Sequence, residues 1–238
     1  DKYIVNGQKT WTTLGQYGDW MFNLVRTSNE GKPQTGISFL LLDMKSPGVT
    51  VRPIKLLDGE CEVNEVFFDN VEVPAENLIG EENKGFSYIL HGMNPERILI
   101  AAEAVGLGRA ALARAAGYAA EREVFGRPIG KNQAIQHPLA EAWMDLEAAH
   151  LMVQKAAWLY DQGKNCAAEA NAAKFLGAEA GYRACERAIF THGGMGYAKE
   201  YHVERYMRES WIPRLAPVSP QLILCFIAEK VLGLPKSY

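Results

Sequence analysis

The sequence lacks the features typical of nucleic-acid-binding and membrane-spanning proteins. Its 238 residues carry 25 Lys and Arg against 28 Asp and Glu, a formal net charge of −3. This balance excludes a basic protein built mainly to neutralise phosphate backbones. No uncharged apolar run reaches the ~18 residues that a spanning helix needs, so no membrane span is expected. Gly and Pro are near average frequency, which excludes a disordered or fibrous chain.

Cysteine is scarce and scattered. The four cysteines lie at positions 61, 166, 185 and 225, and none forms a CxxC pair. A zinc or thioredoxin-like site is therefore not expected, and we predict no metal. Reduced, partly buried thiols of an intracellular protein are the simpler interpretation. With no recognisable signal peptide, the expected location is the cytoplasm of a bacterium or the mitochondrial matrix of a eukaryote.

The first third of the chain has the pattern of β structure. Short apolar runs separated by turn residues predict a hairpin at residues 2–9, with Asn6-Gly7 at its turn. Further strands are predicted at residues 19–27, 36–44, 49–53 and 62–68. Short strands at this spacing are typical of a sandwich or a barrel.

From Lys84 onward the pattern becomes helical. Helices are predicted at residues 85–121, 131–162, 165–191, 203–209 and 220–232, with Gly and Pro in the connections. Three long and two short helices pack most simply as an antiparallel bundle. The predicted fold class is therefore α+β, a β domain followed by a helical bundle.

One carboxylate stands out on the first long helix. Glu96 shares a helix face with apolar residues, namely Ile89, Met93, Ile100 and Leu107. An apolar environment disfavours the charged form, so the pKa of Glu96 is expected to rise, which suits a general base near neutral pH. The alternative is a structural ion pair between Glu96 and an arginine across the bundle.

Six segments, in order, resemble one known family. They are residues 6–13 (NGQKTWTT), 67–74 (FFDNVEVP), 85–86 (GF), 121–133 (ER, then FGRPI and Gln133), 193–197 (GGMGY) and 203–209 (VERYMRE). On these segments the chain resembles the acyl-CoA dehydrogenase family, over essentially its whole length.

The resemblance implies a specific domain organisation. The family has an N-terminal α domain, a middle β-barrel and a C-terminal four-helix bundle. Residues 1–80 correspond to the second half of the middle β domain, and residues 81–238 to the bundle. The expected architecture is a partial antiparallel β-barrel followed by a four-helix-bundle-type domain, with Asp1 inside the barrel rather than at a natural start.

The resemblance also implies FAD as cofactor, bound between barrel and bundle. It places Trp11 and Thr13 against the flavin ring, where an indole offers a flat apolar face and a hydroxyl can hydrogen-bond a ring heteroatom. Taken alone, Trp11 fits the rim or core of a barrel equally well.

Other matching positions reach the FAD of a neighbouring subunit, which implies a homotetramer or dimer of dimers. Arg122, Phe125 and Gln133 fall at such positions, and an arginine fork suits the pyrophosphate. Gly193 and Gly194 match a loop that approaches the same cofactor, where a side chain would clash. Without the resemblance, Arg122 reads as a surface charge and the glycines as a helix C-terminal turn.

The chain departs from the family pattern at two places. Phe190 stands where the family usually has Gln, which removes one polar cofactor contact. Most members carry the catalytic Glu in a segment that corresponds to residues 214–221 (RLAPVSPQ), and no carboxylate lies there. Isovaleryl- and long-chain-type members place it on the first bundle helix instead, and the matching residue is Glu96. Asn94 and Arg97 match substrate-pocket positions.

The implied chemistry is the α,β-dehydrogenation of an acyl-CoA thioester, as in fatty acid β-oxidation. Glu96 removes the α proton while the β hydrogen leaves as hydride to N5 of FAD, and donors stabilise the enolate oxygen. An electron-transfer flavoprotein would accept the electrons of this oxidoreductase. Two alternatives remain open: an FAD-binding member without acyl-CoA dehydrogenase activity, and an assembly subunit that donates contacts to a partner.

Overall fold

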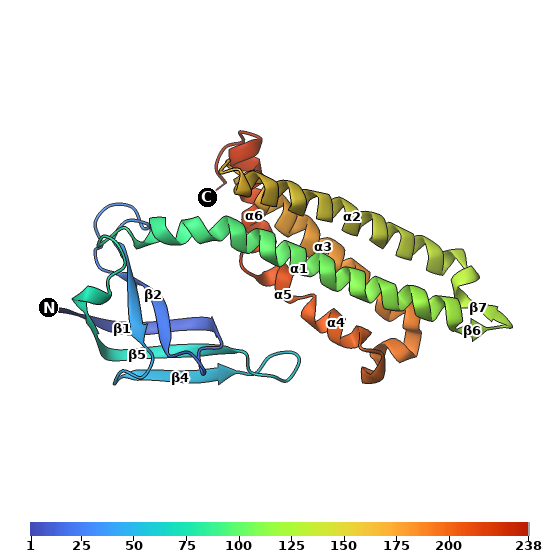
Figure 1. Ribbon diagram of the computed structural model, residues 1–238, viewed down its shortest axis with the longest axis horizontal. Coiled ribbons are helices and arrows are strands. Elements are labelled where there is room, and N and C mark those ends of the chain that lie inside the picture. Colours follow the sequence, from blue (N-terminus) through green and yellow to red (C-terminus); the bar gives the residue numbers. More distant parts are fainter. Residues whose placement is uncertain (238) are drawn as a thin grey trace. The chain divides into compact units, whose positions relative to one another are not determined.

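The computed structural model describes residues 1–237 and contains two compact units. The first covers residues 1–92 and holds the sheets of five strands and the start of the first long helix, and the second starts at Met93 and holds the rest of that helix and the other α-helices (Figure 1). The chain is therefore α+β, as the sequence predicts. The predicted boundary of the two family domains, between residues 80 and 81, stays a prediction.

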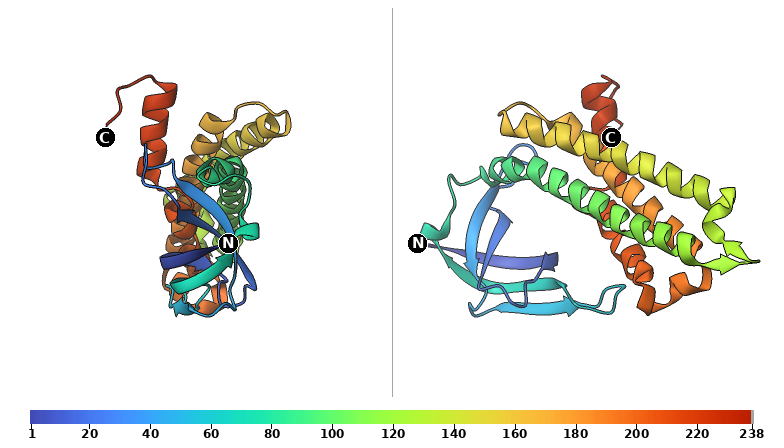
Figure 2. Two further views of the ribbon diagram at one scale, coloured as in Figure 1. Left: turned by 90° about the vertical axis from the view of Figure 1, so that its left-hand side faces the viewer. Right: turned by 45° about the vertical axis from the view of Figure 1, so that its right-hand side comes forward.

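The β unit contains two separate antiparallel sheets. Three strands pair in the order β1-β5-β4, with bounds Lys2–Thr13, Val63–Pro74 and Val49–Ile54. The other two, β2 (Trp20–Arg26) and β3 (Ile37–Asp43), pair in register along their whole length. Within residues 1–237 these sheets close no barrel, in agreement with the expected partial barrel (Figure 2).

The predicted hairpin at residues 2–9 is wrong. β1 runs through Asn6-Gly7 as one 12-residue strand that pairs with β5. The register shifts between Val5 and Gly7, and Oδ1 of Asn6 accepts a hydrogen bond from the backbone N–H of Asn70 at 2.8 Å. The irregularity is a β-bulge whose extra residue lies on β5, because Asn6 alone separates the two pairs on β1 whereas Asp69 and Asn70 separate them on β5.

The interior of the β unit is aliphatic with one exception. Seven buried residues form its core: Val5, Leu40, Leu42, Val66, Phe68, Val71 and Val73. Asn23 on β2 lies opposite Leu40, is 1% exposed, and both its side-chain N and O lack a hydrogen-bond partner among the described residues. A buried amide in this state lowers stability.

The facing edges of the two sheets are not paired. Among the described residues β1 pairs only with β5, and β2 only with β3. A groove of about 370 Å³ lies between them, lined by residues 3–9 and 23–27. One side chain crosses it, because Nζ of Lys9 donates to the carbonyl of Leu24 at 2.7 Å, and burial lowers the pKa of Lys9.

The helical unit is built on three long helices, α1 (Gly85–Glu121), α2 (Gln133–Asp161) and α3 (Ala167–His192). The predicted bounds agree with these to within two residues. A small hairpin, β6 (Glu123–Val124) and β7 (Arg127–Pro128), follows α1. The shorter helices are α4 (Val203–Glu209), α5 (Ile212–Leu215) and α6 (Pro220–Phe226), followed by a π-helical turn at Ile227–Val231.

Small residues let the long helices approach closely. A Cβ on Gly181 would lie 2.4 Å from the carbonyl oxygen of Ala104, and one on Gly108 would lie 2.9 Å from Cα of Gly181. The buried face of α1 accordingly follows Ala101, Ala104 and Gly108 rather than the Ile89–Leu107 stripe on which Glu96 was placed. Val105 and Leu112 extend this buried face, whereas the stripe residues are only half-buried and Glu96 is exposed. The apolar environment expected for Glu96 is therefore not observed.

One C-terminal segment is apolar enough to consider as a membrane span. Residues Val203–Val231 meet the length and composition of a spanning helix, and only 11% of the most apolar window is buried. The structure divides this segment into α4, α5 and α6, with Pro213 and Pro217 at the breaks. A single segment of this kind is weak support for a span, and we assign none.

Candidate functional site

Glu96 lies on an exposed part of α1, beside the two predicted substrate residues. Within residues 1–237, no hydrogen bond or ion pair joins Glu96 to an arginine of another helix, so the expected alternative of a cross-bundle pair is not observed. One turn back, Oδ1 of Asn94 accepts from the guanidinium of Arg97 at 3.0 Å. The structure therefore places Asn94, Glu96 and Arg97 together on one helical turn.

Arg97 is half-buried, whereas its neighbour Glu96 is exposed. Its Nε is buried without a hydrogen-bond partner among the described residues. Burial lowers the pKa of Arg97, and the charge of Glu96 acts in the opposite direction. A guanidinium that is held inward next to a carboxylate provides positive charge and a free donor where an anionic oxygen could bind.

Two side chains of α3 contact residues 214–221, the segment in which most family members carry the catalytic base. Nε of Arg214 donates to the carboxylate of Glu179 at 2.8 Å. Nζ of Lys174, which is 1% exposed, donates to the carbonyl oxygen of Val218 at 2.6 Å. Pro217 lies between these two contacts, after a cis peptide bond. The segment holds no carboxylate, and its one charged side chain, Arg214, is paired with Glu179.

Three predicted cofactor residues lie near the other end of α1. Arg122 directly follows the helix, Phe125 lies at the turn of the β6–β7 hairpin, and Gln133 begins α2. All three are exposed, and Phe125 is fully so at 101%, with a positive φ of 54°. The chain's own packing gives no reason for an exposed phenylalanine in this backbone conformation.

The glycine loop lies at this same end of the bundle. His192, the last residue of α3, stacks on Tyr118 near the end of α1 with ring centroids 4.3 Å apart. Gly193 follows with a positive φ of 58°, and a Cβ at either Gly193 or Gly194 would meet nothing within 4 Å. Internal packing therefore does not require glycine at position 194. Phe190 is exposed here, where the family has a polar residue.

The two groups of residues are too far apart to act on one ligand in one chain. Glu96 and Arg122 are separated by 26 residues of continuous helix, which at 1.5 Å per residue corresponds to roughly 39 Å. Figure 1 shows α1 as one unbroken helix that leads to the β6–β7 hairpin. Glu96 and Arg122 of one chain must therefore contact different ligand molecules, or ligands bound to different subunits of an assembly.

Trp11 and Thr13 are exposed on the same side of β1, in the β unit. The indole of Trp11 is 66% exposed, and its backbone has a positive φ of 67°. Both residues line a cavity of about 480 Å³ formed by residues 9–15, 20–24 and neighbouring side chains. An exposed indole beside a hydroxyl fits the flat, partly polar ring system of a flavin.

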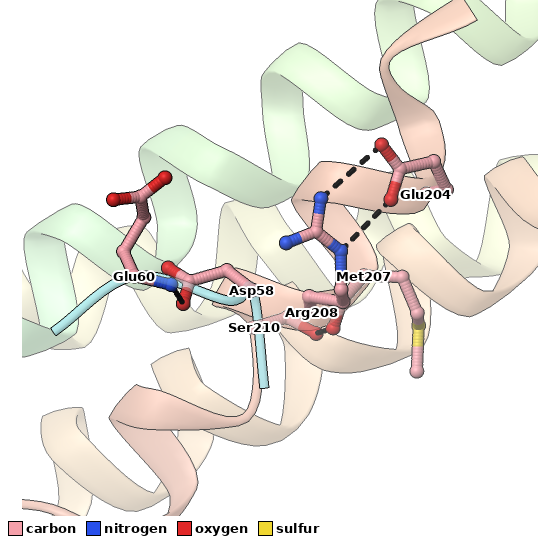
Figure 3. A network of polar contacts seen from close by, with 6 residues as sticks. All are labelled: Asp58, Glu60, Glu204, Met207, Arg208 and Ser210. Carbon is pink, nitrogen blue, oxygen red and sulfur yellow. Dashed lines mark hydrogen bonds and ion pairs between the residues drawn. The ribbon is translucent and has the colours of Figure 1, made fainter. Parts of the chain in front are cut away.

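Some motif residues have a structural role that is visible in the chain itself. In the 203–209 segment, Arg208 donates to Glu204 through Nε at 2.8 Å and through a terminal nitrogen at 3.2 Å (Figure 3). This pair lowers the pKa of Glu204. The hydroxyl of Ser210 donates to the carbonyl of Met207 at 2.7 Å and ends the helix. The segment is thus explained by helix stability.

Sequence reasoning missed Lys174, Gln16 and Asn64. Each is a polar residue that contacts a segment distant in sequence. Lys174 contacts Val218, Gln16 contacts Cys61, and Asn64 contacts Thr12. Lys174 lies among alanines and glycines of α3, and a lone lysine at such a position was the one available signal.

Family models match both parts of the chain. The model of the acyl-CoA dehydrogenase middle domain matches residues 1–71, and that of the acyl-CoA dehydrogenase C-terminal domain matches residues 83–216. The chain belongs to the acyl-CoA dehydrogenase family. This membership implies a flavin cofactor.

Relatives from several bacteria agree with this assignment. An acyl-CoA dehydrogenase of Mycobacterium tuberculosis is 38% identical over 99% of this chain and 62% of its own length. Probable acyl-CoA dehydrogenase YngJ of Bacillus subtilis is 38% identical, over 98% of this chain and 62% of its own. The chain thus spans less than two thirds of the length of these relatives.

Solved structures of the family share the fold. Butyryl-CoA dehydrogenase from Megasphaera elsdenii superposes with a TM-score of 0.91 at 34% identity, over 97% of this chain and 61% of that one. A glutaryl-CoA dehydrogenase in complex with glutaryl-CoA gives 0.93 at 30% identity, over 100% and 60%.

Proposed function

We propose that the chain is part of an FAD-dependent acyl-CoA dehydrogenase in which Glu96 is the catalytic base. The family match over nearly the whole chain supports the reaction class. The observation that supports this assignment most strongly is the position of the carboxylate. Residues 214–221, where most members carry the base, hold none, whereas Glu96 lies beside Arg97 on α1.

The proposed substrate is an acyl-CoA thioester. Glu96 would take the α proton, and Asn94 and Arg97 would line the pocket around it. Arg97, with its unpartnered Nε, would hold positive charge next to the base. When bound, the flavin supplies the acceptor for the β hydrogen as hydride.

The proposed cofactor is FAD, and its site requires a second subunit. Trp11 and Thr13 would contact the flavin ring. Arg122, Phe125, Gln133, Gly193 and Gly194 would contact the FAD of a neighbouring subunit. The wide separation of Glu96 from Arg122 along α1 supports this division. We therefore propose a homotetramer, or dimer of dimers.

Three further proposals follow from the family. An electron-transfer flavoprotein would accept the electrons, and a similar structure described as an electron transferring flavoprotein of Acidaminococcus fermentans supports this pairing. The two family domains would meet near residues 80 and 81, between the matched segments. The location would be the bacterial cytoplasm or the mitochondrial matrix, where the four free thiols stay reduced.

Flavin absorbance tests this function directly. The purified chain is mixed with FAD, freed of excess cofactor, and titrated with straight-chain, branched and dicarboxylic acyl-CoAs under anaerobic conditions. A bound flavin band that bleaches with at least one acyl-CoA is the expected result. Bound FAD that no acyl-CoA bleaches would instead favour an FAD-binding member without this activity.

A further inference from the structure

A β-bulge presents Trp11 on the surface of the β unit. Lys9 pairs with Val66 and Thr12 with Asn64, so β1 has one residue more than β5 between these pairs. Trp11 lies in this bulge with a φ of 67°. A non-glycine residue in the left-handed region is strained, and such a conformation persists only where surrounding contacts hold it.

Asn64 supplies these contacts from the neighbouring strand. Its side chain is fully buried, and Nδ2 donates to the carbonyl oxygen of Thr12 at 3.0 Å and to Oε1 of Gln16 at 2.5 Å. Nε2 of Gln16 in turn donates to the carbonyl of Cys61 at 2.6 Å. The side-chain amides of Asn64 and Gln16 thus link β5, and the turn before it, to the residues that precede and follow Leu14.

The orientation of both amides is fixed by their partners. A backbone carbonyl can only accept, so Nδ2 and not Oδ1 of Asn64 must face Thr12, and Nε2 of Gln16 must face Cys61. The arrangement leaves Oδ1 of Asn64 buried without a donor among the described residues. A leucine of similar volume would avoid that penalty, but it could not donate to Thr12.

A second contact fixes the same turn. The backbone N–H of Leu14, which also has a positive φ of 52°, donates to the carbonyl of Glu62 at 2.7 Å. A side chain at Gly15 would lie 3.5 Å from Nδ2 of Asn64, so the turn packs directly over this amide. The residues on either side of Thr12, namely Trp11 and Thr13, are exposed as a consequence.

We propose that Asn64 is a positioning residue for the flavin site, and that it holds the bulge from which Trp11 and Thr13 face the ring. This inference rests on the proposed function, which supplies the flavin. Asn64 itself touches no cofactor. It acts through the backbone of Thr12, and Gln16 supports it from the far side of the turn.

The test compares Asn64→Leu with the unchanged chain, first without cofactor. The indole N–H resonance of Trp11 is identified by its loss in Trp11→Phe. In Asn64→Leu we expect this resonance to move or broaden, and the amide of Leu14 to exchange faster with solvent. Asn6→Leu is the matched control, because Asn6 bridges the other bulge of the same strand pair. It should leave both signals of the Trp11 bulge unchanged.

The second measurement is the affinity for FAD, from quenching of flavin fluorescence. Asn64→Leu should weaken binding by about tenfold, equivalent to roughly 1.4 kcal/mol, while Asn6→Leu should bind as the unchanged chain does. If Asn64→Leu does not fold, Gln16→Met removes one partner of the same network and should show smaller changes in the same direction.

An unaltered Trp11 resonance, or unaltered FAD affinity, in a folded Asn64→Leu or Gln16→Met protein would overturn the inference. Failure of the unchanged chain to bind FAD has a different meaning. It would overturn the proposed function and the cofactor role of Asn64, while the indole resonance would still report whether Asn64 holds the bulge.

Discussion

The β unit and the helical unit differ in how many of their buried polar groups have partners. In the β unit, Asn23 is buried with neither amide atom paired, and the facing edges of β1 and β2 lack a strand partner within residues 1–237. In the helical unit, buried Lys174 has a partner at Val218, and close packing comes from alanine and glycine. Among the described residues the helical unit leaves one buried side-chain atom without a partner, Nε of Arg97 at the candidate site, whereas the β unit leaves both amide atoms of Asn23 and Oδ1 of Asn64 without one.

The largest effect is expected at the closest helix contact. In Gly181→Ala the new methyl group would meet the backbone oxygen of Ala104 at 2.4 Å, and backbone atoms cannot move aside locally. We expect a loss of about 2 kcal/mol in the free energy of unfolding. Urea unfolding followed by helical circular dichroism measures it.

Gly117→Ala is the matched control for this contact. Gly117 lies on α1, and a Cβ there would meet nothing within 4 Å. The replacement should stabilise the helix by about 0.5–1 kcal/mol. Equal effects of the two substitutions would show that the small residues of this helix pair are not required for packing.

The burial of Lys174 in the helical core is expected to make the free energy of unfolding depend on pH. Burial is the main cause that lowers the pKa of Lys174 from 10.5 to about 8. Between pH 8 and 10.5 the unfolded chain therefore binds more protons at this site than the folded chain. The free energy of unfolding should rise across this window relative to Lys174→Met, and the difference should be constant below pH 8.

Urea unfolding at several pH values measures this difference. Lys155→Met serves as the control, because Lys155 is exposed on α2 and pairs with Glu169. Its stability should follow the pH dependence of the unchanged chain. If the free energy of unfolding varied with pH in the same way for Lys174→Met and the unchanged chain, burial would not lower the pKa of Lys174.

A smaller effect, of opposite sign, is expected in the β unit. Asn23→Leu replaces an unpaired amide by an aliphatic side chain of similar size next to Leu40 and the valine core. The free energy of unfolding should rise by about 1 kcal/mol. Thermal unfolding followed by the near-ultraviolet signal measures it. A decrease would mean that Asn23 already has partners in solution, and the contrast between the units would disappear.

Periodicity and turn residues were sufficient to predict most elements. The bounds of α1 and α4 agree with the sequence pattern, and strands β2 to β4 agree within one or two residues. Asn6-Gly7 was misassigned because the same dipeptide suits a hairpin turn and a position opposite a bulge, and only pairing with β5 decides between them. That partner strand lies about 60 residues away, beyond the reach of any local pattern.

The candidate site was predictable to a more limited extent. Glu96 was selected from an apolar stripe, but in the structure it is exposed and α1 buries a different face, which includes Ala104 and Val105. The resemblance nevertheless selects the same residue. Asn64 could not be predicted, because its importance depends on a carbonyl 52 residues earlier. Local sequence specifies elements, whereas positioning contacts depend on tertiary structure.

The central claim is that Glu96 performs proton abstraction in place of the absent base at residues 214–221. Its most direct test is the anaerobic reduction of bound flavin by the best acyl-CoA, in the unchanged chain and in Glu96→Gln with equal FAD content. We expect Glu96→Gln to bind FAD and acyl-CoA still, but its flavin to bleach at least about 1000-fold more slowly. Bleaching at the unchanged rate in Glu96→Gln would contradict it.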